Sequence, residues 1–216
     1  MLKSTPLAKP VSESLGRFFG WVPLHPNTIT FFSIVFAAAG FVLFFYSQFL
    51  SGFIFFLLAF FLDAVDGAVA RAKNLTSKKG AFLDGISDRL VEFFLILAFF
   101  ISIADPTTQL MLVSILFFGT CMTSFVKAYA VHSGLLDNEA ARRMPGILER
   151  AERSVLLLLG LGFWVVGLGT YLLPLLAFIA FLYAASASSY FACASRTRPR
   201  LYIAAQFFES EANALS

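Results

Sequence analysis

Charge is scarce in this chain. Of its 216 residues, only 13% are Asp, Glu, Lys or Arg, whereas 59% are hydrophobic and 28 are Phe. So few polar residues cannot cover the surface of a water-soluble globule, which excludes the soluble classes of protein. The composition is that of an integral membrane protein.

Cysteine and histidine are also rare. Cys121 and Cys193 lie in apolar stretches without the spacing of metal ligands, and we interpret both as small buried hydrophobic residues. His25 and His132 flank apolar segments, where we expect interfacial residues rather than ligands. No short apolar segment with a small-residue cleavage site follows Met1, so no removed signal peptide is indicated.

Apolar stretches long enough to cross about 30 Å of hydrocarbon recur along the chain. We expect an all-α fold with six transmembrane helices, at about 28–47, 50–70, 86–104, 108–131, 149–169 and 171–194.

Basic residues are confined to alternate connections. The turns near 47–51, 104–109 and 167–171 carry no Lys or Arg. The positive-inside rule therefore places both termini and the two long connections in the cytoplasm, in the cell membrane. The same distribution argues against a nucleic-acid partner and suits anionic lipids and substrates. The 16 basic residues are Lys3, Lys9, Arg17, Arg71, Lys73, Lys78, Lys79, Arg89, Lys127, Arg142, Arg143, Arg150, Arg153, Arg196, Arg198 and Arg200.

The segment before the first span is amphipathic. One helical stripe is apolar and Trp21 follows it, which predicts a helix lying in the membrane interface. We divide the chain into a cytoplasmic N-terminus with this helix (1–25), a six-span domain (26–200) and a cytoplasmic tail (201–216). The residues of the stripe are Val11, Leu15, Phe18, Phe19 and Val22.

Four aspartates interrupt the apolar sequence. Asp63 and Asp66 are three residues apart near the end of the second span, and Asp84 and Asp88 are four apart at the start of the third. Either spacing places two side chains on one face of a helix, so the pairs can meet across a helical hairpin. At about 1.5 Å per residue, the first pair lies in the cytoplasmic third of the membrane.

The four carboxylates cannot all be ionised in a dry site unless a metal supplies positive charge. Their hard oxygen atoms suit Mg²⁺, Mn²⁺ or Ca²⁺, and two facing pairs fit a two-metal site that binds phosphoryl oxygens. Two alternatives remain open from the residues alone. The acids could form a cation or proton relay in a transporter, or a solvated salt-bridge network.

The spacing of these residues resembles a family signature. The stretch "DAVDGAVAR" from Asp63, followed by Gly80, Asp84 and Asp88, reproduces the pattern DxxDGxxAR, seven or eight residues, GxxxDxxxD of the CDP-alcohol phosphatidyltransferases. This resemblance implies that an acceptor hydroxyl attacks the β-phosphate of a CDP-linked lipid and releases CMP.

The resemblance also implies roles for individual residues. Asp63, Asp66, Asp84 and Asp88 resemble the ligands of two Mg²⁺ or Mn²⁺ ions, and Asp88 resembles the residue that takes the proton from the acceptor. The expected CDP-lipid pocket comprises Gly67, Ala70, Arg71, Gly80, Asn27 and Thr30. For Asn27 and Thr30 the alternative is a helix N-cap, with Thr30 facing a neighbouring helix.

The identity of the acceptor alcohol depends on residues outside this signature. The stretches "SFVKAYA" and "GILERAERSVLLL" resemble the branch that uses inositol phosphate, although Tyr129 and a long connection before 146 depart from its bacterial members. Lys127, Arg150, Arg153 and Arg196 come from three helices at one membrane depth, and several cations suit a phosphorylated acceptor. Glycerol 3-phosphate or serine is the alternative acceptor, and membrane anchoring is the alternative role for these cations. We also expect a homodimer, although lipid contact would equally explain the Phe-rich third and fourth spans.

Overall fold

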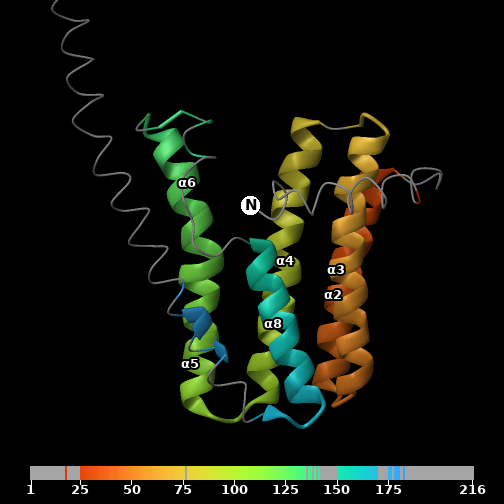
Figure 1. Cartoon of the computed structure of the whole chain (residues 1–216), viewed down its shortest axis with the longest axis vertical. Helices are drawn as coiled ribbons and strands as arrows, with labels where there is room; N and C mark the ends of the chain where they lie inside the picture. The colour runs from red at the N-terminus through yellow and green to blue at the C-terminus, as the bar shows by residue number, and fades with distance from the viewer. Residues whose placement is uncertain are drawn as a thin grey trace, which may run out of the picture.

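The structure is a computed structural model. It describes Phe18 and residues 25–75, 77–134, 136–137, 139, 141, 150–169, 175–176, 178–180 and 182. Within these residues every regular element is a helix and no strand occurs (Figure 1). The helices are α2 (Pro26–Phe45), α3 (Phe49–Ala72), α4 (Lys78–Ser102), α5 (Pro106–Ser114), the π-helix η2 (Ile115–Met122), α6 (Thr123–His132) and α8 (Arg150–Val165).

Three described helical stretches are long and apolar enough to cross a membrane: Pro26–Phe45, Phe49–Ala72 and Pro106–His132, the last formed by α5, η2 and α6 end to end. Helix α4 is as long, but its apolar part carries Asp88, Arg89 and Glu92. The sixth span and the N-terminal interfacial helix fall mostly outside the described residues, so both stay predictions.

Local capping fixes where the helices around the acids begin. Pro26 opens α2, where its missing N–H costs no helical hydrogen bond, and His25 Nδ1 accepts from the amide of Asn27 at 3.3 Å. Ser77 caps α4 by accepting from the amide of Gly80 at 3.0 Å. Helices α2 and α4 begin at the same end of the bundle, where α3 ends (Figure 1).

Helix α2 packs along both α3 and α4. Glycines allow its close approach to α3: a Cβ atom on Gly52 would lie 2.9 Å from the carbonyl oxygen of Gly40 and would clash with the ring of Phe44. Small residues at such crossings let helix backbones approach within a membrane. At the other end of the same helix pair, the start of α2 lies against the acidic end of α3, where Thr30 contacts Asp66.

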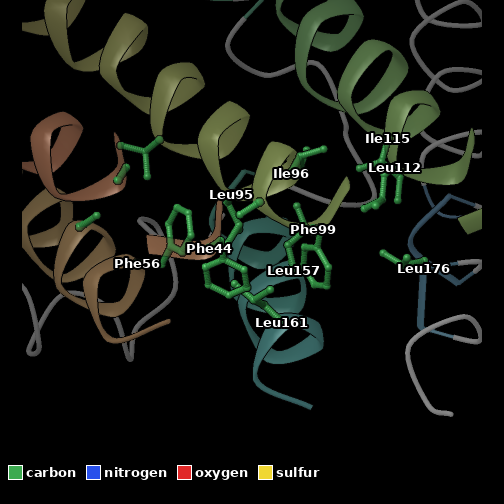
Figure 2. Close-up of a cluster of buried hydrophobic side chains, with 14 of the residues drawn as sticks. Phe44, Phe56, Leu95, Ile96, Phe99, Leu112, Ile115, Leu157, Leu161 and Leu176 are labelled. Atoms are coloured by element: carbon green, nitrogen blue, oxygen red, sulfur yellow. The ribbon is translucent and has the colours of Figure 1, made fainter. Parts of the chain in front are cut away.

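The main apolar core lies in the half of the bundle away from that end. It joins the second half of α2, the first half of α3 and the later turns of α4 to α5 and α8 (Figure 2). Its labelled members are Phe44, Phe56, Leu95, Ile96, Phe99, Leu112, Ile115, Leu157, Leu161 and Leu176.

One prediction about the interior was wrong. Cys121, which we expected to be buried, is exposed in η2, near the exposed Phe117 and Phe118. In a membrane protein, side chains that face lipid are as apolar as those of the core, so hydrophobicity alone does not indicate burial. Cys193 lies outside the described residues.

Candidate active site

A pocket of about 200 Å³ lies where α2 and α4 begin and α3 ends. It combines carboxylates, one guanidinium and small residues, so polar groups converge at the end of an otherwise apolar bundle. Its lining is Pro26, Asn27, Thr30, Asp66, Gly67, Ala70, Arg71, Leu75, Ser77, Gly80, Ala81 and Asp84.

Two of the predicted aspartates, Asp66 and Asp84, line this pocket, and Asp63 lies beside them. Asp63 and Asp66 of α3 and Asp84 of α4 each offer a carboxylate oxygen, and these atoms lie within 4.8 Å of one another. Asp66 is 3% exposed, while the other two are half-buried. A set of hard oxygen donors drawn from two helices fits a divalent cation such as Mg²⁺, Mn²⁺ or Ca²⁺.

Thr30 connects α2 to this acidic group. Its Oγ1 donates to Asp66 Oδ2 at 2.5 Å. Ser33 Oγ donates to the carbonyl oxygen of Thr30 at 2.7 Å and lies 3.2 Å from Ser87 Oγ of α4. Thr30 thus faces a neighbouring helix, which is one of the two roles expected from the sequence. It also lines the pocket, as the other role requires.

The variant Thr30→Val tests this support. Valine keeps the shape of threonine but cannot hold the Asp66 carboxylate, so we expect Mn²⁺ affinity to fall by about 10–100-fold, as for other outer contacts of metal ligands. Titration of purified protein with Mn²⁺ would measure it. Ser114→Ala, which removes an exposed hydroxyl on α5 that bonds only its own helix, is the control. Equal affinities in the two variants would contradict the role of Thr30.

Asp88 stands apart from the group of three. It lies one turn beyond Asp84 on α4 and is 6% exposed. Its Oδ2 is 3.5 Å from Nη1 of Arg89, whose Nη2 donates to Ser124 Oγ of α6 at 2.5 Å. Asp88 therefore lies between the acidic group and a polar contact from α4 to α6.

The six residues expected to form the CDP-lipid pocket all line the observed pocket. Its glycines keep the walls clear. A Cβ atom on Gly67 would lie 3.4 Å from Nη1 of Arg71, and one on Gly80 would lie 3.1 Å from Ser77 Oγ. The Arg71 guanidinium thus lies beside Gly67 at ordinary contact distance, whereas Ser77 Oγ approaches Gly80 more closely.

The structure describes three of the four cations expected to bind the acceptor. Lys127 is half-buried on α6, and Arg150 is the first residue of α8. Arg153 is 3% exposed and is paired with Glu92 of α4. Arg196 lies outside the described residues. The structure therefore gives the side-chain positions of Lys127 and Arg153 only.

Two residues of this region were missed by the sequence analysis. Ser77 both caps α4 and lines the pocket, and its position three residues before Gly80 is a capping signal. Glu92 follows Asp88 by four residues inside a predicted span, and an acid there is a functional candidate by default. Both signals were available in the sequence.

Comparison with known proteins agrees with this geometry. The chain is 30% identical over 183 residues to the archaetidylinositol phosphate synthase of Pyrococcus horikoshii, covering 83% of this chain and 92% of that protein.

Solved structures of the phosphatidylinositol phosphate synthase of Mycobacterium tuberculosis share the fold. The form with CDP-DAG bound has a TM-score of 0.62 at 24% identity and covers 88% of this chain and 92% of that one. The form in complex with manganese and citrate has a TM-score of 0.63 at 23% identity and covers 86% and 88%. Because residues 23–191, which hold the pocket and all four aspartates, match the family description "CDP-alcohol phosphatidyltransferase", the chain belongs to that family of enzymes.

Proposed function

We propose that this enzyme transfers a phosphatidyl-type group, built on diacylglycerol or archaeol, from a CDP-linked lipid to inositol phosphate and releases CMP. One observation carries the proposal: three carboxylates lie within 4.8 Å of one another at a pocket lined by all six residues expected to bind the CDP-lipid. Family membership makes an enzyme the better interpretation of the acids than a transporter relay.

Asp63, Asp66 and Asp84, with Asp88 beside them, would hold two divalent cations, Mg²⁺ or Mn²⁺. Bound cations would neutralise the diphosphate of the CDP-lipid and stabilise charge on its phosphoryl oxygens. Thr30 orients Asp66 through its 2.5 Å hydrogen bond. The manganese found with the similar M. tuberculosis protein supports a site for a divalent cation.

The other pocket residues would bind and orient the nucleotide lipid. The Arg71 guanidinium lines the pocket beside Gly67, where it can hold a phosphate oxygen. Asn27 and Gly80 face each other across the start of the pocket, where a Cβ atom on Gly80 would lie 3.6 Å from Asn27 Oδ1. Because Gly80 has no side chain, a nucleotide can approach the backbone at this position.

Asp88 would act as the general base. Its carboxylate takes the proton of the acceptor hydroxyl, whose oxygen attacks the β-phosphorus while the bond from that phosphorus to the CMP oxygen breaks. Burial and its place outside the group of three suit a base more than a first ligand.

The named relatives support inositol phosphate as the acceptor. Archaetidylinositol phosphate synthases and phosphatidylinositol phosphate synthases recur among them. Lys127, Arg150 and Arg196 are the cations we propose for the acceptor phosphate, whereas Arg153 reaches it only by leaving Glu92. We further propose that the chain crosses the cell membrane six times and that its pocket opens to the cytoplasm. We also propose a homodimer, which cross-linking in native membranes would test.

Acceptor choice is tested by CMP release. Purified enzyme with CDP-lipid should turn over with inositol phosphate and less well with glycerol 3-phosphate. Free inositol and serine should support little turnover, because they lack the phosphate charge that binds the cations. Lys127→Met should raise the KM for inositol phosphate about 10-fold or more, the loss expected for a charged hydrogen bond. The KM for CDP-lipid should change little.

Lys79→Met, which removes an exposed cation in the first turn of α4, is the matched control and should leave both KM values unchanged. If free inositol or serine supports CMP release as well as inositol phosphate does, the proposed acceptor is wrong.

A further inference from the structure

A carboxylate and a guanidinium are paired inside the bundle, one helical turn beyond Asp88. Glu92 of α4 is fully buried and Arg153 of α8 is 3% exposed. Arg153 donates from Nε to Glu92 Oε1 and from Nη2 to Glu92 Oε2, the latter at 2.6 Å. Its Nη1 donates to the carbonyl oxygen of Gly119 in η2 at 3.0 Å. This pair therefore joins α4, η2 and α8 at one point.

Glu92 shares a helical stripe with the acids of the pocket. Asp84, Asp88 and Glu92 follow one another at four-residue spacing, which places them on one face of α4. Exposure falls along this stripe, from the half-buried Asp84 through Asp88 at 6% to Glu92 at 0%. Any rotation of α4 that moves Glu92 therefore also turns Asp84 and Asp88.

Helix packing alone does not require charges at this place. Apolar residues of similar volume usually stabilise an interior as well as a buried ion pair does, or better. A bidentate pair, however, has fixed directions at both partners, so it specifies rotation as well as contact. Its third partner, Gly119, lies in a π-helix, a form found mostly at functional sites.

We propose that Glu92 and Arg153 are positioning residues, which fix the rotation and depth of α4 so that Asp84 lines the pocket and Asp88 lies one turn behind it. The inference rests on the proposed function only in taking these acids to hold divalent cations. Arg153 then acts on α4 through Glu92, and not on the acceptor phosphate as the sequence suggested.

Removing both charges together gives the main test. The double variant Glu92→Met with Arg153→Leu leaves no unpaired charge and is expected to fold, because apolar pairs replace buried ion pairs well. Titration with Mn²⁺ alone should show affinity weakened by about 10-fold or more, the effect typical of lost support for metal ligands. Arg153→Lys, which keeps the positive charge but loses the bidentate guanidinium, should weaken the Mn²⁺ affinity less.

Leu161→Ala is the control for a purely structural role, since Leu161 lies fully buried in the core on the same helix. Its cavity should lower the melting temperature while Mn²⁺ affinity stays unchanged.

Unchanged Mn²⁺ affinity in the folded double variant would overturn the proposal. So would an Arg153→Lys variant that raises the KM for inositol phosphate at unchanged Mn²⁺ affinity, because Arg153 would then bind the acceptor. The titration needs neither CDP-lipid nor acceptor, so inactivity toward inositol phosphate would contradict the proposed function and leave this result standing.

Discussion

Replacing Asp88 with asparagine is expected to lower CMP release by about 10²–10⁴-fold, the usual contribution of a general base. CDP-lipid binding should change little and Mn²⁺ binding should weaken only in part, because the three carboxylates that meet within 4.8 Å remain. Single-turnover CMP release and separate titrations with Mn²⁺ and CDP-lipid would measure the two effects.

The matched control is Asp105→Asn. Asp105 caps α5 by accepting from the amide of Thr108 at 2.7 Å, at the end of α4 opposite the pocket, and asparagine caps a helix equally well. This variant should therefore retain turnover. If Asp88→Asn loses Mn²⁺ binding together with turnover, Asp88 is primarily a metal ligand and the base must be another group.

Removal of divalent cations should abolish the reaction. A chelator is expected to lower CMP release by at least about 10²-fold, because the cations supply several kcal/mol of charge stabilisation at the phosphoryl group. Added Mg²⁺ or Mn²⁺ should restore turnover in the wild-type enzyme. Asp66→Asn should not be rescued at the same cation concentration, because it alters a 3% exposed member of the acidic group.

Mn²⁺ binding measured by calorimetry should give about two ions per chain for a two-metal site. Full activity in a chelator without added cation would disprove metal assistance. If only one ion binds and the enzyme is fully active, the acidic group is still a metal site but the two-metal mechanism is wrong.

The positions of the helices could be predicted because hydrocarbon thickness demands about 20 apolar residues per span. The first predicted span, 28–47, corresponds to α2 (Pro26–Phe45), and the second, 50–70, corresponds to α3 (Phe49–Ala72). The third was less accurate: α4 begins at Lys78 rather than near 86, because the Ser77 cap starts the helix within polar sequence. The meeting of three aspartates could be predicted because spacings of three and four fix a helical face.

Contacts between distant helices could not be predicted in the same way. Glu92 and Arg153 are 61 residues apart, and Thr30 and Asp66 are 36 apart. Their partners depend on how each helix is rotated, and an apolar surface that can face either lipid or protein leaves that rotation open. The exposure of Cys121 was predicted wrongly for the same reason.

The uneven distribution of apolar packing has a consequence for motion. The large core lies at the end remote from the pocket, whereas the pocket end has a separate small cluster of Ile29, Val65 and Val69. Regions with few buried apolar contacts open locally at low free energy, while well-packed regions open only when the whole protein unfolds. Amide hydrogen exchange should therefore be fastest at the start of α2 and slowest around Phe56 and Leu95. We therefore expect the pocket end of the bundle to open locally while the other end stays folded.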